Sequence, residues 1–295
     1  MSTTLRFTGH DTFACRATWL NKGLNYLDDN DLTSMTKDEA VVSLGVGKNM
    51  LQAIRHWVRA FNLVDDKGSK TPHATLIGSR SNQGFDYLLE STDSIWLLHL
   101  NLIQSGYASI YPIFFKEFFK RKSSGLFTEE EFIRFLNSLL LQTDIKVPSE
   151  KTLKNDFKVL LDLYCPRPSK GQEDALTNLL TDLNLIVRTD HKSNGEVVYE
   201  LNNAAHQSIS TRLFAGMMFT AFEETLSVSF DNSFDLIGLA LGMTREEFME
   251  RLDSVCLEFP EHFVFKEDAG LKVVQCAGYR SKESFCFQPE SQEAC

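Results

Sequence analysis

Two short segments in the first sixty residues contain the residue types that phosphate chemistry uses. In the first segment His10 stands next to Asp11, and Arg16 follows within a stretch that is expected to be helical. A histidine beside a carboxylate can act as a general base or bind a metal ion during hydrolysis of a phosphodiester. An arginine one helical turn away can hold a phosphate by two parallel hydrogen bonds. This segment therefore predicts a phosphate site with His10 and Asp11 as catalytic residues, Arg16 as a DNA contact, and Mg²⁺ or Mn²⁺ as the cofactor.

A purely structural interpretation of the same segment stays open. Asp11 or Thr12 would cap a helix that begins at Phe13, and His10 would form a hydrogen bond to the backbone. Asparagine caps helices as well as aspartate does, so an Asp11→Asn change separates the two interpretations.

The second segment, residues 40–64, predicts a helix–turn–helix. Gly45 and Gly47 bracket the expected turn, where a positive φ angle costs little only for glycine. The apolar residues that follow recur with the period of one helix face, namely Met50, Leu51, Ile54, Trp57, Val58 and Phe61. The opposite face holds no acid and consists of Lys48, Asn49, Gln52, Arg55, His56 and Arg59. A basic outer face on the second helix predicts contact with DNA, and the Asp-Lys-Gly turn within residues 65–77 predicts a winged-helix hairpin after it.

The pattern of a helix–turn–helix followed by a hairpin recurs in two later segments. Thr128 is expected to cap one helix and Ser149 the next, whose exposed lysines Lys151, Lys154 and Lys158 either contact DNA or form a solvated face. The alternating strands LIVRTD and EVVYEL flank a polar turn and predict a hairpin. A third outline spans residues 234–257 and is followed by a hairpin at residues 263–275. Its second helix is acidic, which argues against DNA contact there.

These three sequence patterns predict a mainly α-helical protein with small β-hairpins. We expect an α+β fold built from several winged-helix or helix–turn–helix modules. The expected domains are an N-terminal helical region with a winged helix–turn–helix (1–125), a middle module (126–205), an acidic C-terminal module (206–281) and a tail (282–295). A single helix of residues 207–226 is expected to open the third module.

Charge and composition limit the partners. The chain of 295 residues carries a net charge of −10. Residues 223–268 contain twelve acidic and three basic residues, so this segment alone carries −9 and the remainder is almost neutral. DNA is therefore expected at the N-terminal and middle parts, and a protein partner at the C-terminal part. No apolar run reaches the ~18 residues of a membrane helix, and no signal peptide is visible, so we expect a cytoplasmic protein with reduced cysteines and no membrane contact.

Several blocks of the sequence, taken in order, resemble one family. They are GHDTFACRATWLNKG, DEAVVSLGVGKNMLQAIRHWVRAFNLV, SIWLLHL, SEKTLKNDF and EDAGL. Together they resemble the SspB-like proteins of bacterial single-strand DNA phosphorothioation systems, which are also catalogued as a domain of unknown function. The resemblance implies a component of a DNA sulfur-modification and phage-defence system that nicks one DNA strand so that sulfur can replace a phosphate oxygen. It also implies partners, which are a cysteine desulfurase, an ATPase and a sulfurtransferase resembling a PAPS reductase.

Two functions are therefore expected from the sequence. The first is a DNA-binding component of a phosphorothioation system that acts as a metal-dependent nickase on duplex DNA. The second is a non-catalytic winged-helix adaptor or transcriptional regulator. The sequence has no P-loop, no dinucleotide fingerprint and no H-E-x-x-H zinc motif, so it offers no support for those enzyme classes.

Overall fold

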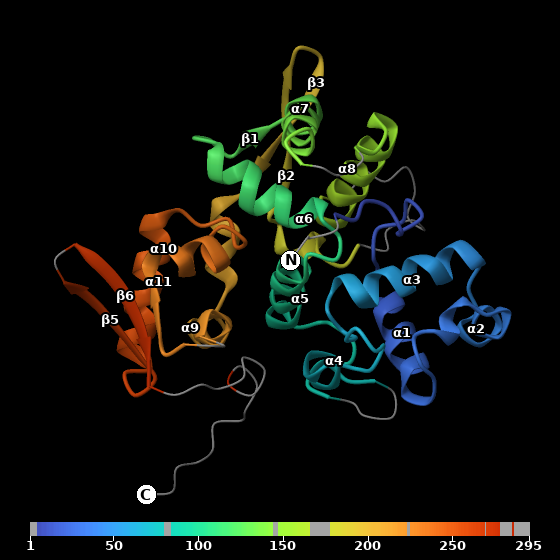
Figure 1. Cartoon of the computed structure of the whole chain (residues 1–295), viewed down its shortest axis with the longest axis horizontal. Coiled ribbons are helices and arrows are strands. Elements are labelled where there is room, and N and C mark those ends of the chain that lie inside the picture. Colours follow the sequence, from blue (N-terminus) through green and yellow to red (C-terminus); the bar gives the residue numbers. More distant parts are fainter. Residues whose placement is uncertain are drawn as a thin grey trace, which may run out of the picture. The chain divides into compact units, whose positions relative to one another are not determined.

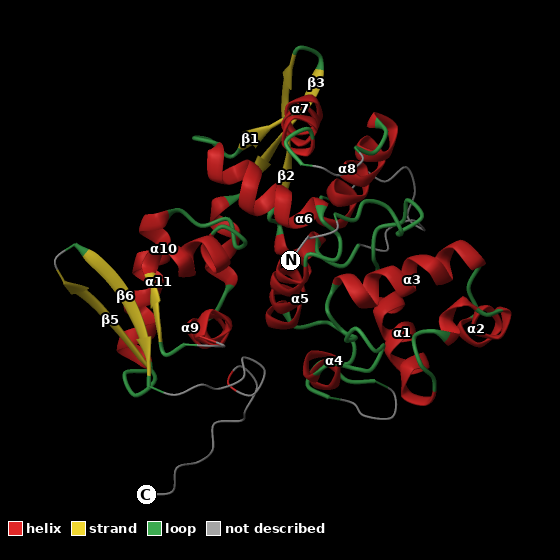
Figure 2. Cartoon of the chain, viewed as in Figure 1, coloured by secondary structure: helices red, strands yellow, loops and turns green. Residues whose placement is uncertain are grey.

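The computed structural model describes residues 5–79, 84–143, 147–165, 178–222, 225–268, 270–277 and 285. The chain forms two compact units, Met1–Ala205 and His206–Cys295 (Figure 1). Figure 2 shows that helices dominate and that the strands gather in small sheets. Within the described ranges each unit contains one three-stranded antiparallel sheet, which confirms the expected mixture of helices and hairpins. The predicted tail at 282–295 lies outside these ranges apart from Phe285.

The N-terminal part of the first unit is built on helices α1 (Ala17–Asp29), α2 (Asp38–Leu44) and α3 (Lys48–Ala60), with a short 3₁₀ turn η1 (Ser34–Thr36) before α2. Helices α1 and α3 approach closely at Gly23, where a Cβ atom would lie 2.8 Å from Cγ1 of Val58. A larger residue would push the helices apart, so Gly23 sets their separation.

The hairpin expected in residues 65–77 is wrong. The turn itself forms, since the carboxylate of Asp65 accepts hydrogen bonds from the backbone of Lys67 (2.9 Å) and Ser69 (2.8 Å). The pairing ends at a single bridge between Val64 and Lys70, and α4 (Pro72–Ile77) follows. Thr71 caps α4 by accepting from the backbone of Ala74, and Pro72 occupies its first turn, so the sequence starts a helix where a second strand would be needed.

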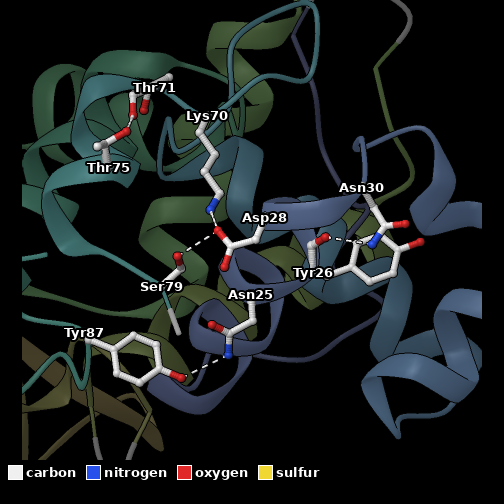
Figure 3. A network of polar contacts seen from close by, with 9 residues as sticks. All are labelled: Asn25, Tyr26, Asp28, Asn30, Lys70, Thr71, Thr75, Ser79 and Tyr87. Carbon is white, nitrogen blue, oxygen red and sulfur yellow. Dashed lines mark hydrogen bonds and ion pairs between the residues drawn. The ribbon is translucent and has the colours of Figure 1, made fainter. Parts of the chain in front are cut away.

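A polar network fastens this segment to the end of α1 (Figure 3). Asp28 accepts from the ammonium of Lys70 and from the hydroxyl of Ser79 (2.7 Å), and Asn25 donates to the hydroxyl of Tyr87 (3.0 Å). These contacts fix the chain that leads from the helix–turn–helix into the next part of the unit.

Helix α5 (Thr92–Ser105) is the central helix of the first unit, because its residues from Ser94 to Ile103 are all buried. The next helical stretch is irregular, with α6 (Ile110–Pro112), a π-helical turn η2 (Ile113–Phe118) and a 3₁₀ turn η3 (Phe119–Arg121).

The remainder of the first unit is a small α+β module. Strand β1 (Leu126–Phe127) precedes α7 (Glu129–Leu140) and α8 (Glu150–Tyr164), and η5 (Thr181–Leu183), β2 (Ile186–Ser193) and β3 (Glu196–Leu201) follow. Thr128 and Ser149 cap the two helices as predicted. The core of this module is aromatic, with ring centroids in contact at 5.0–6.4 Å among Phe114, Phe127, Phe132 and Phe157.

The second unit repeats that layout. The 3₁₀ segment η6 (Asn203–Ser208) contains the boundary between the units. After it come α9 (Thr211–Met218), η7 (Phe219–Phe222), β4 (Ser227–Ser229), α10 (Phe230–Ser233), η8 (Phe234–Gly238), α11 (Arg245–Glu258), β5 (Phe263–Asp268) and β6 (Leu271–Cys276). The single helix expected for residues 207–226 is wrong, because Ser210 caps a helix that starts at Thr211 and gives way to a 3₁₀ turn at Phe219.

The two sheets have the same strand order. The strands run β1-β3-β2 in the first unit and β4-β6-β5 in the second, so the strand before the helix pair lies beside the last strand of each sheet. Each module therefore follows one plan, in which a strand, two helical segments and a hairpin succeed a helical stretch. The boundary between domains expected at residue 125 stays a prediction.

Candidate nucleic-acid interface

The two helices and the glycine turn predicted for residues 40–64 are present as α2, Gly45–Gly47 and α3. Gly45 ends α2 in the left-handed conformation (φ 60°), whereas Gly47 precedes α3 in an extended conformation (φ −72°) that needs no glycine. Leu51, Ile54 and Trp57 are buried, which confirms the apolar face of α3.

Three arginines, two of them on α3, gather at one end of the polar face of this helix. The guanidinium carbon of Arg6 lies 4.2 Å from the ring centroid of Tyr107, and that of Arg59 lies 6.0 Å from the same ring. Arg6 also donates to the hydroxyl of Tyr107 at 3.1 Å. Arg55 stands close enough to feel the charges of both other arginines. We call Arg6, Arg55 and Arg59 the arginine cluster.

The backbone holds Arg6 in this position. Its N–H donates to the hydroxyl of Ser109 at 2.8 Å, and its carbonyl accepts from the N–H of Ser109 at 3.0 Å. These two bonds tie the start of the chain to the segment just after Tyr107, so the guanidinium and the ring meet although they are far apart in sequence.

No carboxylate neutralises the arginine cluster among the residues that the structure describes. Burial and the neighbouring charges of Arg59 and Arg6 lower the pKa of the Arg55 guanidinium. Its Nε atom is buried and has no hydrogen-bond partner. Like charges held together without a counterion cost free energy, so this arrangement is typical of a site that binds an anion.

His56 does not lie on the exposed face of α3, so its expected placement there is wrong. Its side chain is 4% exposed and packs between Trp57 and Tyr107, with ring centroids at 5.2 and 5.5 Å. Burial, followed by the charges of His10 and Arg6, lowers its pKa to about 3, so the imidazole is neutral at physiological pH. On α3 this residue belongs to the layer beneath the arginine cluster.

His10 pairs with an acid that the sequence did not indicate. Its Nε2 atom lies 3.1 Å from Oδ1 of Asp156 on α8, and its Nδ1 accepts from the backbone N–H of Thr12 at 3.1 Å. Because Nδ1 accepts, the proton sits on Nε2 and is donated to Asp156. The other carboxylate oxygen of Asp156 accepts from the N–H of Thr8 at 2.8 Å. Both side chains are buried, at 6% and 3% exposure, so the pair holds a loop in place and is covered by protein.

The loop that this pair holds has a strained backbone. Thr8, Asp11 and Thr12 have φ angles of 70°, 46° and 64°, which β-branched residues such as threonine rarely adopt. Asp11 is exposed. Helix α1 starts only at Ala17, with Arg16 as an N-cap that makes no side-chain hydrogen bond. The helix cap expected from Asp11 or Thr12 is therefore wrong, as is the helical turn between Asp11 and Arg16, while the expected backbone hydrogen bond of His10 is confirmed.

Of the remaining residues predicted to contact DNA, two lysines form ion pairs on the surface. Lys48 pairs with Asp38 (2.8 Å) and Lys154 pairs with Glu150 (2.7 Å), all on the surface. Exposed positions are also confirmed for Asn49, Gln52, Lys151 and Lys158, and Arg16 is half-buried with its guanidinium 6.0 Å from the ring of Trp19.

The surface beside Lys154 is acidic. An open hollow of about 430 Å³ lies between α7, α8 and the start of β3, and glutamates outnumber cations around it. Its lining includes Glu129, Glu130, Glu150 and Glu196 against Arg134 and Lys154. The negative potential of this hollow opposes contact with a phosphate backbone at this end of α8.

A metal site does not emerge from the described part of the chain. No group of three histidine, cysteine or carboxylate side chains is placed there so that it could hold an ion. His10 and Asp156 are already bonded to each other, and a hard cation such as Mg²⁺ prefers oxygen ligands. The metal expected from the sequence therefore stays a prediction, and no chemical step is assigned to one.

Sequence reasoning missed three residues of this region, namely Arg6, Tyr107 and Asp156. For Asp156 there was a signal, since an acid stands on the otherwise apolar face of α8 between Leu153 and Phe157. Such a residue needs a buried partner. Nothing local to Arg6 or Tyr107 indicates that they meet.

The fold and this surface describe a mainly helical protein that combines the helix pair α2–α3, an arginine cluster to which the described residues supply no carboxylate, and two modules of the same layout. The chain belongs to the family described as protein of unknown function (DUF4007), whose model matches residues 7–287.

Two solved structures are similar to almost the whole chain. One is a crystal structure of SspB with 24% sequence identity, and the other is a magnesium ion-bound SspB crystal structure with 25% identity. Each similarity has a TM-score of 0.77 and covers 95% of this chain and 85% of the SspB chain. The resemblance to SspB-like proteins is thereby confirmed. None of the curated proteins matches the chain. Within the described residues no helix has the length and apolar character needed to cross a membrane.

Proposed function

We propose that this protein is the DNA-binding component of a DNA phosphorothioation system and that it holds duplex DNA through the arginine cluster and the adjoining face of α3. The observation that carries the proposal is the convergence of Arg6 and Arg59 on the ring of Tyr107, with Arg55 within electrostatic reach of both and no carboxylate partner among the described residues. Phosphate contacts by arginine supply much of the affinity of proteins for DNA. The similarity to SspB structures supports the assignment to this class of system.

The layout of the two α+β modules supports the same proposal. A helical stretch, a strand, two helical segments and a hairpin, with the first strand beside the last, is the plan expected of a winged helix. We propose that both modules are winged-helix modules, although α8 borders an acidic hollow and α11 is acidic. DNA contact is therefore assigned first to α3, with Lys151 and Lys158 of α8 as a secondary contact.

The second unit is assigned to a protein partner. Glu246, Glu250 and Asp253 are exposed and follow one another along one stripe of α11, where no cation interrupts them. This surface repels DNA and complements a basic protein surface. Other members of the phosphorothioation machinery (the ATPase, the PAPS-reductase-like sulfurtransferase and the cysteine desulfurase) are the partners proposed here.

The proposal of DNA binding is tested with fluorescence anisotropy on a labelled duplex. Arg55→Gln should weaken binding about tenfold or more, because each charge-assisted contact to phosphate contributes about 1.5–3 kcal/mol. Arg134→Gln is the matched control, since Arg134 lies on α7 and is already paired with Glu130 at 2.7 Å. Equal affinities of the two variants would overturn the assignment of the site.

Nicking of one strand is the second function that we propose, and the strained loop at residues 8–12 favours it. Strained backbone persists where the surrounding contacts enforce it, and such positions concentrate at functional sites. Here the buried pair of His10 and Asp156 enforces the loop, and Asp11 is its exposed carboxylate. Relaxation of supercoiled plasmid by purified protein with Mg²⁺ or Mn²⁺, compared with EDTA, tests this function. Binding without relaxation would leave the adaptor as the function.

A further inference from the structure

The arginine cluster concentrates more positive charge than one internal phosphate of DNA can balance. The guanidinium groups of Arg6 and Arg59 share a single tyrosine ring at 4.2 and 6.0 Å, and Arg55 is within electrostatic reach of both. An internal phosphodiester carries one negative charge. A terminal phosphomonoester carries about 1.5–2 negative charges at pH 7 and offers three strong acceptor oxygens.

An unsatisfied donor lies within the same cluster. The Nε atom of Arg55 is buried without a hydrogen-bond partner, and the buried ring of His56, 5.5 Å from that of Tyr107, also has an Nε2 atom without a partner. A buried donor without an acceptor costs free energy, which an oxyanion that reaches this donor would recover. Tyr107 adds a further donor, because its hydroxyl accepts from Arg6 and keeps its own proton available.

We infer that the arginine cluster is a binding site for the terminal phosphomonoester of a DNA strand, the group exposed at a nick or gap. This inference rests on the proposed binding of DNA and specifies which phosphate the site prefers. The site assembles Arg6 from the first residues of the chain, Arg55 and Arg59 from α3, and Tyr107 from the turn after α5. A dianionic group with three oxygens can engage several of these donors at once, whereas an internal phosphate has two free oxygens to offer.

The experiment compares four duplexes of one sequence in an anisotropy titration. One is intact, one has a nick with a 5′-hydroxyl and 3′-hydroxyl, one has a nick with a 5′-phosphate, and one has a nick with a 3′-phosphate. We expect one of the phosphorylated nicks to bind about tenfold more tightly than the hydroxyl nick, because the monoester adds about one charge-assisted hydrogen bond. The two phosphorylated probes distinguish which strand end the site takes.

Three variants locate the effect. Arg6→Gln and Arg55→Gln should abolish the preference for the phosphorylated nick, and Arg134→Gln should retain it in full. Arg6 is exposed and its position is fixed by backbone bonds to Ser109, so its substitution leaves the fold intact.

Each outcome decides between the two claims. Equal affinity for phosphorylated and unphosphorylated nicks, with strong binding to all four duplexes, would overturn the terminal-phosphate site and leave the DNA-binding function standing. A preference that survives in both cluster variants would place the site elsewhere. Absence of binding to every duplex would overturn the inference and the proposed function together.

Discussion

Acidification should destabilise the first unit through His56. The imidazole is buried against Trp57 and Tyr107, and its pKa falls to about 3, mainly because burial penalises the charged form. In the unfolded chain the pKa returns to about 6.5. Between these two values the unfolded state binds a proton that the folded state does not, so the free energy of unfolding rises with pH in this window and is lost as the pH falls.

The magnitude follows from the two pKa values. Each pH unit inside the window changes the stability by about 1.4 kcal/mol per proton, so the contribution of His56 should fall by about 2 kcal/mol between pH 7 and pH 5. The whole difference between the unfolded pKa of about 6.5 and the folded pKa of about 3 corresponds to about 5 kcal/mol, which is the upper limit of the loss on acidification. His56→Gln removes the titrating group and should flatten the stability profile over this range, whatever its effect on the stability at pH 7.

Tryptophan fluorescence is a suitable probe because all three tryptophans, Trp19, Trp57 and Trp96, belong to the first unit. Urea unfolding followed by this signal at several pH values therefore reports on that unit alone. His191→Gln is the matched control, since His191 is exposed on β2 and its removal should leave the profile unchanged. Parallel profiles of the natural protein and His56→Gln would refute the assignment of a buried neutral imidazole.

Three further predictions concern the loop and the arginine cluster. Asp156→Asn should cost about 2–4 kcal/mol in urea unfolding, because one of the hydrogen bonds of His10 is lost in a buried site, while Asp190→Asn on the surface should cost almost nothing. Arg55→Gln should raise the free energy of unfolding by about 0.5 kcal/mol at low salt, because it relieves like-charge repulsion. Added salt should remove this gain. Destabilisation by this substitution would show that the arginines do not repel one another. Asp11→Asn should abolish plasmid relaxation without changing the melting temperature, because the exposed carboxylate caps no helix, and full activity in this variant would remove Asp11 from the proposed nicking.

Local signals in the sequence were sufficient to predict most of the helices. The 3.6-residue spacing of Leu51, Ile54 and Val58 predicted α3, and the hydroxyl residues Thr128 and Ser149 predicted the starts of α7 and α8. Caps and helix periodicity depend on neighbours within about four residues, so sequence alone reveals them. The hairpin after α3 failed for a similarly local reason, because the helix start at Thr71 and Pro72 outweighed the turn before it.

The site could be predicted only in part, because its contacts join distant segments. His10 is adjacent to Asp11 in sequence, but its partner is Asp156, 146 residues away. Arg6 reaches Tyr107 because Ser109 binds its backbone 103 residues further along the chain. His56 has the polar character of an exposed helix face, yet the loop at Gly9 covers it so closely that a Cβ atom on Gly9 would lie 2.8 Å from its Nδ1. Periodicity within α3 carries no information about that covering segment.

The salt dependence of duplex affinity tests the central claim most directly. The observed association constant should fall linearly with salt on a double-logarithmic plot, with a slope of about −0.9 for each phosphate contact. The triple variant of Arg6, Arg55 and Arg59, each changed to Gln, should therefore show a slope less steep by roughly 2–3 than the natural protein, while Arg134→Gln keeps the natural slope. A triple variant that folds normally and retains both the affinity and the slope would contradict the claim that the arginine cluster binds DNA.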